Sequence, residues 1–169
     1  LARAWKATPY GTARTADKIE RARALGLADG AAVTADVTAI QAAVEQWTGG
    51  RGIDVTLDLL GGPYLGASIR AAAPRGRSSL IGTIAGRAAE IPVGVVLVKR
   101  LTLRGTVLRA RSVGEKRAVT AAFVRDVLPL VESGAVVPTV DSVFALDDIR
   151  AAHERLGSNA TFGKVVVTC

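Results

Sequence analysis

Three residues near the start of the chain have side chains suited to holding a phosphate group. Arg14, Thr15 and Lys18 follow a short strand-like segment and open a helix-like one. Two cations and a hydroxyl at a helix N-terminus offer a phosphate both positive charge and hydrogen-bond donors. The alternative is that Arg14 and Lys18 are solvated and that Thr15 is an ordinary N-cap.

Hydrolytic and metal chemistry have little support in the residue inventory. His153 is the only histidine and Cys169 the only cysteine, so a Ser-His-Asp or Cys-His arrangement would need a histidine that we expect on a helix surface. The sequence has no Gly-x-Ser-x-Gly elbow, and its carboxylates do not cluster. We therefore expect neither an internal disulfide nor a metal site.

Two glycine clusters follow predicted strands. Gly61-Gly62 comes after one strand-like run, and Gly82 with Gly86 comes after the next. The carboxyl ends of strands in an open α/β sheet line the ligand crevice, where glycine lets the backbone approach a ligand closely. Plain turn glycines are the alternative. The chain contains no G-x-G-x-x-G fingerprint.

Apolar periodicity predicts alternating helices and strands along most of the chain. Helices are predicted at about 15–25, 38–47, 63–72 and 114–131, and strands at about 31–33, 53–60, 77–82 and 101–107. An irregular stretch is predicted from 83 through 92. The inward face of the long fourth helix is predicted to carry Val119, Phe123, Val127 and Leu130. This alternation calls for a mostly parallel α/β sheet with right-handed crossovers.

The end of the chain is predicted to form a β-α-β segment. Strand-like runs at 137–144 and 164–167 flank a helix at 147–156. Asp147 is the expected N-cap of that helix and Gly157 its expected stop.

Composition limits the possible partners and environments. The chain has 169 residues, a net charge of +7 and a mean hydropathy of +0.30, which fits one domain-sized chain with a partly covered surface. Its 17 arginines and 5 lysines are scattered and only 4% of residues are aromatic, so nucleic acid is not an expected partner. The longest apolar run, 91–98, is far below the roughly 20 residues that span a bilayer. The single cysteine fits a reducing, cytoplasmic compartment.

Several segments together resemble the medium-chain dehydrogenase/reductase superfamily, specifically its zinc-free NADPH:quinone oxidoreductase branch. The similar segments are GTARTADK (11–18), ALG (24–26), TGGRGIDV (48–55), LDLLGG (57–62), KRLTLRGTVLRARS (99–112) with EK (115–116), and AAH (151–153) through FGKVVV (162–167). The likeness covers essentially the whole chain in order.

The resemblance implies a Rossmann-like, doubly wound parallel sheet lacking its first strand, followed by a C-terminal β-α-β return segment. Residues 1–134 would be a partial dinucleotide-binding domain, and 135–169 would pack on a GroES-like catalytic domain. Because the chain has no methionine and begins as though inside a fold, we expect a C-terminal fragment of a two-domain parent. The cofactor is expected to be NADP(H), since small residues followed by Arg14 stand where an acidic residue would bind the free 2′-hydroxyl of NAD.

The resemblance also carries residue roles. It implies that Arg14, Thr15 and Lys18 bind the 2′-phosphate and that Leu60 and Gly61 form the turn along the adenosine. Gly82 and Thr83 would form the loop near the ribose and nicotinamide. Leu108 and Arg109 would lie beside the nicotinamide amide, and Lys164 near the cofactor cleft. No side chain is assigned as a catalytic acid or base.

The resemblance implies an activity for the parent. It would pass hydride to a quinone or conjugated carbonyl, with the fragment alone inactive. An alcohol dehydrogenase, an enoyl reductase and a non-catalytic remnant that binds or dimerises are the alternatives. A homodimer is expected through strand 101–107, where apolar and polar residues alternate and the edge carries no proline. The alternative is an unpaired edge strand that is guarded by Arg104 and twisted away.

Overall fold

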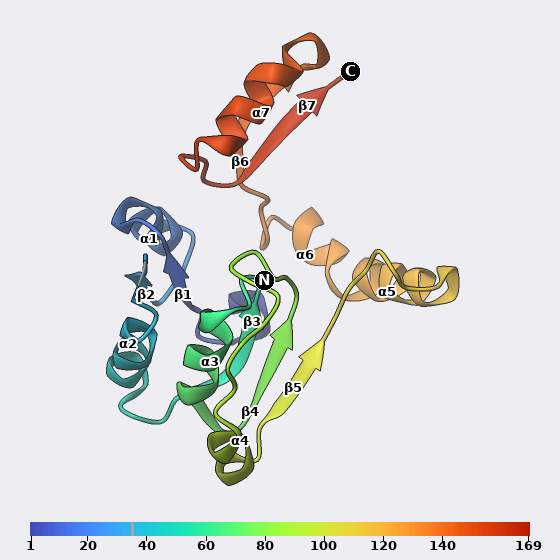
Figure 1. Ribbon diagram of the computed structural model, residues 1–169. Coiled ribbons are helices and arrows are strands. Elements are labelled where there is room, and N and C mark those ends of the chain that lie inside the picture. Colours follow the sequence, from blue (N-terminus) through green and yellow to red (C-terminus); the bar gives the residue numbers. More distant parts are fainter. Residues whose placement is uncertain (35) are drawn as a thin grey trace. The chain divides into compact units, whose positions relative to one another are not determined.

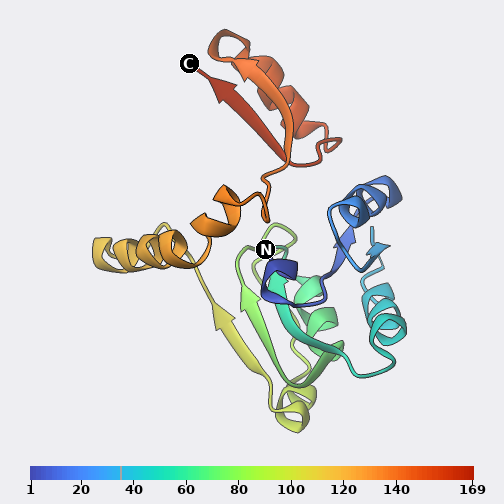
Figure 2. The same ribbon diagram turned by 180° about the vertical axis from the view of Figure 1, so that it is seen from behind.

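The computed structural model describes residues 1–34 and 36–169 and divides into two compact units. One unit comprises residues 7–117, and the other comprises residues 118–169 together with 1–6. Figures 1 and 2 show the elements of both units from opposite sides. The predicted domain boundary at residue 134 remains a prediction.

The unit 7–117 is built from parallel strands joined by helices. A two-stranded sheet pairs β1 (Tyr10–Ala13) with β2 (Asp29–Ala32), and a three-stranded sheet has the order β3 (Ile53–Asp58), β4 (Ala72–Leu80), β5 (Thr102–Gly105). The connecting helices are α1 (Ala16–Ala24), α2 (Ala39–Thr48), α3 (Pro63–Arg70) and α4 (Val93–Lys99).

The predicted parallel α/β fold is confirmed, including a break in the sheet. All of these pairings are parallel. Among the described residues, no strand pairs with β1 on the side away from β2, or with β3 on the side away from β4. The break lies where the resemblance places the first, central strand of a Rossmann-like sheet, in which strand order runs 3-2-1-4-5-6.

Helices α2 and α3 connect the two sheets through a small apolar core. The buried residues Val33, Ile40, Val44, Ala67 and Ala71 form one cluster, against which Ile53, Trp47 and Tyr64 pack. At its margin Tyr10 of β1 stacks on Trp47 with ring centroids 5.2 Å apart. The Tyr10 hydroxyl also donates to the Trp47 carbonyl at 3.1 Å. The helix layer therefore holds the two sheets together across the break.

Helix α4 was not predicted, because its sequence is rich in β-branched residues that favour strands. Its position is fixed by Lys99, whose ammonium donates to the carbonyl oxygens of Arg70 at 2.8 Å and Ala72 at 2.6 Å. These carbonyls lie at the end of α3 and the start of β4. Strand β4 begins at Ala72, directly after the α3 cap at Ala71 and before the predicted start at residue 77.

The predicted helix 114–131 is two helices, α5 (Val113–Asp126) and α6 (Leu128–Glu132). Pro129 lies in the first turn of α6, where its missing N–H is tolerated, and it cannot continue α5. The predicted inward face was wrong for Val119 and Phe123, which are 41% and 48% exposed, whereas Val127 and Leu130 are half-buried. Every residue of α5 is exposed or half-buried.

The unit that ends the chain includes the short 3-10 turn η1 (Arg3–Trp5), the part of α5 from residue 118, and α6. The rest of this unit has the predicted β-α-β order. Strand β6 (Val140–Ala145) pairs in parallel with β7 (Lys164–Thr168), and α7 (Ile149–Gly157) crosses between them. Helix α7 ends at Gly157 as predicted. Asp147 is not its N-cap, because the chain enters through the 3-10 turn η2 (Leu146–Asp148) and the cap falls on Asp148.

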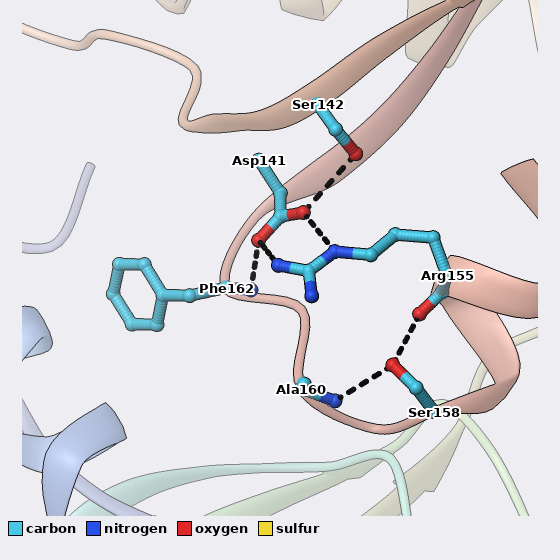
Figure 3. Close-up of polar contacts among 6 residues, drawn as sticks. All are labelled: Asp141, Ser142, Arg155, Ser158, Ala160 and Phe162. Atoms are coloured by element: carbon cyan, nitrogen blue, oxygen red, sulfur yellow. Dashed lines mark hydrogen bonds and ion pairs between the residues drawn. The ribbon is translucent and has the colours of Figure 1, made fainter.

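A buried carboxylate organises this second unit (Figure 3). The side chain of Asp141 is 2% exposed and accepts two hydrogen bonds from the Arg155 guanidinium, at 2.9 and 3.0 Å. It also accepts the Phe162 amide at 2.8 Å and the Ser142 hydroxyl at 3.1 Å. Arg155 and the Phe162 amide hold the pKa of Asp141 far below its ordinary value. These contacts tie the turn before β7 to β6 and α7.

Within the described residues, none of the helices combines the length and the apolar character that crossing a lipid bilayer requires.

Candidate functional site

A buried carboxylate shapes the turn after β3. Asp58 is 5% exposed, and its Oδ1 atom accepts the backbone N–H groups of Leu60 at 2.8 Å and Gly61 at 2.9 Å. Gly61 and Gly62 follow with φ values of 64° and 52°, a conformation that glycine adopts without steric cost. The strand therefore ends in a tight turn that leads directly into α3.

The turn after β3 interlocks with the loop after β4. The Asp58 carbonyl accepts the N–H groups of Ile81 at 2.7 Å and Gly82 at 3.3 Å, and the Leu60 carbonyl accepts the Ala85 N–H at 2.8 Å. A Cβ atom at Gly61 would lie 2.9 Å from the Gly86 oxygen and 3.2 Å from the Thr83 Cα. The structure thus brings four predicted site residues together: Leu60, Gly61, Gly82 and Thr83.

These contacts bear on the two interpretations of the glycines. A Cβ atom at Gly82 would overlap the Leu59 carbonyl oxygen, and one at Gly62 would lie 2.8 Å from the Ala85 oxygen. The glycines are therefore needed for the close approach of one loop to the other. Their predicted approach to a ligand remains a prediction.

The segment after β5 adjoins the same edge of the sheet. The Thr106 N–H donates to the Leu80 carbonyl at 2.9 Å, which continues the β4–β5 ladder to the point where the loop from Gly82 begins. Leu108, 58% exposed, and the exposed Arg109 follow within a few residues. The loops after β3, β4 and β5 thus form one continuous edge.

The predicted phosphate-binding residues lie at the junction of β1 and α1. Arg14 and Thr15 directly follow β1, and Thr15 occupies the N-cap position of α1 with extended backbone angles. The side chains of Arg14 and Thr15 are exposed, and Lys18 is half-buried one turn into the helix. A hydrogen bond from the Thr15 hydroxyl, with help from the backbone amides of the first turn, holds the pKa of Asp17 below its ordinary value.

Lys164 belongs to the other unit. It is the first residue of β7, is exposed, and its N–H donates to the Thr139 carbonyl at 2.9 Å. Its predicted position near a cofactor cleft remains a prediction. His153 is an exposed residue of α7, which confirms the predicted position on a helix surface.

Asp58 is the site residue that the sequence reasoning missed. The signal was present, because Asp58 is a carboxylate in a mostly apolar predicted strand, three residues before Gly61, and a buried carboxylate needs a hydrogen-bonding partner. Along the chain positions 1–34 and 36–169, no group of three His, Cys, Asp or Glu side chains could hold a metal ion.

The chemistry offered by this edge is binding and orientation. Tightly packed backbone follows β3 and β4, and an apolar side chain with an arginine follows β5; in the separate two-stranded sheet, two cations and a hydroxyl follow β1. An extended ligand with a phosphate at one end and a less polar group at the other matches that distribution of donors.

Comparison with known proteins identifies related sequences. The sequence profile of a family described as zinc-binding dehydrogenase matches residues 30–167. A 2-haloacrylate reductase from a Burkholderia species is 29% identical over 165 residues, which make up 95% of this chain and 48% of that protein. The quinone oxidoreductase-like protein 2 of Bos taurus is 24% identical over 129 residues, or 76% of this chain and 37% of that protein.

Solved structures share the fold. A mycobacterial protein in complex with NADPH matches 99% of this chain and 52% of its own, with a TM-score of 0.78 and 24% identity. At that identity the likeness concerns the fold alone. The chain spans about half the length, or less, of the proteins it matches.

Proposed function

Because this chain belongs to the zinc-binding dehydrogenase family, within the medium-chain dehydrogenase/reductase superfamily, we propose that it forms the cofactor-binding part of an NADPH-dependent reductase. The protein passes hydride to a quinone or a similar conjugated carbonyl. Relatives named as a 2-haloacrylate reductase and a quinone oxidoreductase-like protein support a reductase of conjugated acceptors.

The observation that carries the choice of NADPH is the residue set at the end of β1. In dinucleotide-binding folds the end of this strand faces the adenosine ribose, and an acidic residue there binds the 2′-hydroxyl of NAD. Here the strand ends in small residues, Arg14 directly follows it, and Thr15 and Lys18 come next along the chain as the N-cap and first turn of α1. Asp17 adds a negative charge nearby, and its carboxylate accepts the Thr15 hydroxyl and attracts Lys18, so a bound 2′-phosphate competes with Asp17 for both groups.

The cofactor, when bound, supplies the hydride, and this chain binds and orients it. Arg14, Thr15 and Lys18 hold the 2′-phosphate, and Leu60 and Gly61 lie along the adenosine. Gly82 and Thr83 lie near the ribose and nicotinamide, Leu108 and Arg109 beside the nicotinamide amide, and Lys164 near the cofactor cleft. The buried Asp58 keeps the turn at Leu60 and Gly61 in place for this role.

Cofactor preference tests the proposal directly. The full-length protein that contains this chain should reduce a quinone with a higher kcat/KM for NADPH than for NADH. Equal values for the two cofactors would overturn the assignment of the 2′-phosphate site.

The acceptor distinguishes the alternatives within the superfamily. Steady-state rates with a panel of quinones, enones, acrylates and primary alcohols separate a quinone reductase from an enoyl reductase or an alcohol dehydrogenase. A protein that binds NADPH but turns over none of these substrates would instead support a non-catalytic binding module.

The isolated 169-residue chain should be inactive, because the chain covers only about half of its relatives and positioning of both reactants needs a complete cleft. NADPH-dependent quinone reduction by the purified chain would contradict this.

A cytoplasmic location belongs to the same proposal and fits the single, exposed Cys169. Fractionation of the source cells tests the location.

We also propose that the full-length protein is a homodimer paired through β5. Within the described residues β5 pairs only with β4, and the Thr106 N–H points inward to Leu80. Because strand amides alternate in direction, the N–H of Gly105 points outward.

Gly105→Pro removes that outward donor, and an added Cβ there would meet no heavy atom of the described residues within 4 Å. The variant should be monomeric by light scattering, whereas Gly105→Ala should stay dimeric. An unmutated protein that is monomeric at micromolar concentration would exclude the dimer.

A further inference from the structure

The segment that joins β5 to α5 is held by three sets of side-chain hydrogen bonds. Arg111 donates through Nη2 to the Thr106 hydroxyl at 2.7 Å, which closes the segment across its base. Lys116 reaches back from α5 and donates through Nζ to the Arg109 carbonyl at 3.0 Å. Ser112 and Glu115 bond reciprocally at the start of the helix, with Ser112 N and Oγ donating to Glu115 Oε2 at 2.9 and 2.8 Å.

The outer side of this segment is open. Val107 is 61% exposed and Leu108 58% exposed, and Arg109 is exposed beside them. The side chains that hold the segment, Arg111 and Lys116, are half-buried. The segment is therefore fixed from its inner side and presents two apolar residues and a cation outward.

The Lys116 contact is not needed to start helix α5. The Ser112–Glu115 pair already satisfies amides of the first turn, as in a capping box, and the Lys116 N–H is bonded to the Ser112 carbonyl at 3.0 Å. The contact is exposed, so water competes for the ammonium, and the contact adds less to stability than a buried charge-assisted hydrogen bond does. Its specific effect is to fix the carbonyl of Arg109 and, with it, the directions in which Leu108 and Arg109 point.

We infer that Lys116 and Arg111 are positioning residues, which fix the 106–112 segment so that Leu108 and Arg109 meet the nicotinamide end of the cofactor. This inference rests on the proposed function. A segment that is already ordered loses less conformational freedom when a ligand binds, so its contacts contribute more to affinity. The adenosine end is contacted by other elements and does not depend on this segment.

The test compares two ligands on variants of the full-length protein. Lys116→Met removes the ammonium and keeps most of the side-chain volume. It should weaken NADPH binding about tenfold, or lower kcat by a similar factor, because the nicotinamide end is misplaced. The affinity for 2′,5′-ADP, which has only the adenosine end, should be unchanged. Arg111→Met should act in the same direction. Lys116→Arg should bind NADPH about as well as the unmutated protein, because arginine keeps an N–H donor for the Arg109 carbonyl.

Lys99→Met is the matched control. Lys99 also donates an ammonium to backbone carbonyls, but at the amino end of β4, so this variant should change neither affinity. Amide hydrogen exchange of residues 106–112 should rise in Lys116→Met and stay unchanged in Lys99→Met.

The possible outcomes separate the inference from the proposed function. A faster-exchanging segment with unchanged NADPH affinity and kcat would overturn the inference. Equal weakening of NADPH and 2′,5′-ADP by Lys116→Met would also overturn it, because that pattern indicates general damage to the fold. Failure of the unmutated protein to bind 2′,5′-ADP would overturn the proposed function and the inference together.

Discussion

The two ends of the candidate site are built in different ways. At β3 and β4, the turn from Asp58 and the loop from Ile81 are joined by backbone hydrogen bonds, a buried carboxylate and close glycine contacts. At the junction of β1 and α1, the groups assigned to the ligand are the side chains of Arg14, Thr15 and Lys18 on one strand end and one helical turn.

Because the two ends are built differently, substitutions at each end should have different effects. Substitutions at the first end remove hydrogen bonds or space that the fold itself needs, so they should reduce stability before they affect a ligand. Substitutions at the second end remove the exposed side chains of Arg14 and Thr15 or the half-buried side chain of Lys18, so they should alter ligand choice and leave the fold intact.

The largest effect is expected at Asp58. Asp58→Ala removes the acceptor of two N–H groups and leaves the amides of Leu60 and Gly61 without it. The free energy of unfolding should fall by about 4 kcal/mol, since each charge-assisted bond contributes roughly 2 kcal/mol. Urea denaturation measures the loss. Asp58→Asn keeps an acceptor and should lose less; equal losses for the two variants would mean that the carboxylate oxygen is not what holds the turn.

A smaller effect is expected at Gly82. The Cβ atom of Gly82→Ala would overlap the Leu59 carbonyl oxygen, and relieving such overpacking costs about 2 kcal/mol of unfolding free energy. Gly94→Ala is the matched control, because its Cβ would meet no heavy atom of the described residues within 4 Å and it lies in helix α4. This control should be neutral or slightly stabilising. Similar unfolding midpoints for both variants would show that the two loops are not tightly interlocked.

Arg14→Ala should leave the unfolding midpoint unchanged and reduce the preference for NADPH over NADH by about 1.5 kcal/mol, or roughly tenfold in the ratio of kcat/KM values. Lys18→Ala should act in the same direction. Arg117→Ala, which removes an exposed cation on α5, controls for net charge. A clear loss of stability in Arg14→Ala, with the cofactor ratio intact, would contradict the contrast between the two ends.

The smallest effect is expected in the titration of Asp17. The pKa of Asp17 lies below its ordinary value of 3.8, first because the Thr15 hydroxyl donates to its carboxylate. A depressed pKa means that this hydrogen bond contributes above the ordinary pKa and is lost as the pH falls through the lowered value. Thr15→Ala should raise the pKa of Asp17 toward 3.8, whereas Thr15→Ser should leave it low. NMR titration of the carboxyl carbon measures both, and an unmoved pKa in Thr15→Ala would remove Thr15 as the cause.

Periodicity predicted the alternating elements because their apolar positions follow either a helical or a strand period. It missed α4, where the valine-rich run 93–98 forms a helix that Lys99 ties to α3 and β4. That contact is made with residues far away in the sequence, so local propensity could not reveal it. Periodicity also joined α5 and α6, although Pro129 was a visible reason to separate them.

Within the site, the sequence located the turns better than the contacts that hold them. Gly61 and Gly82 were recognised from their place after strands, and the structure joins their loops. Asp58 and Lys116 escaped functional interpretation, because their roles depend on which backbone groups the fold brings within reach. A charged residue inside an apolar strand is nevertheless a sequence signal that deserves a structural question.

The stacked pair Tyr10 and Trp47 has a spectroscopic consequence. The chain has two tryptophans: Trp5, 58% exposed, lies in the unit that ends the chain, and the half-buried Trp47 lies in the unit 7–117. In a Trp5→Phe variant, all indole fluorescence comes from Trp47, whose ring lies flat against Tyr10 with an interplanar angle of 3°. The emission maximum then reports whether β1 is seated on α2. Detachment of β1 would expose the indole to water and shift its emission to longer wavelength while the rest of the unit is still folded.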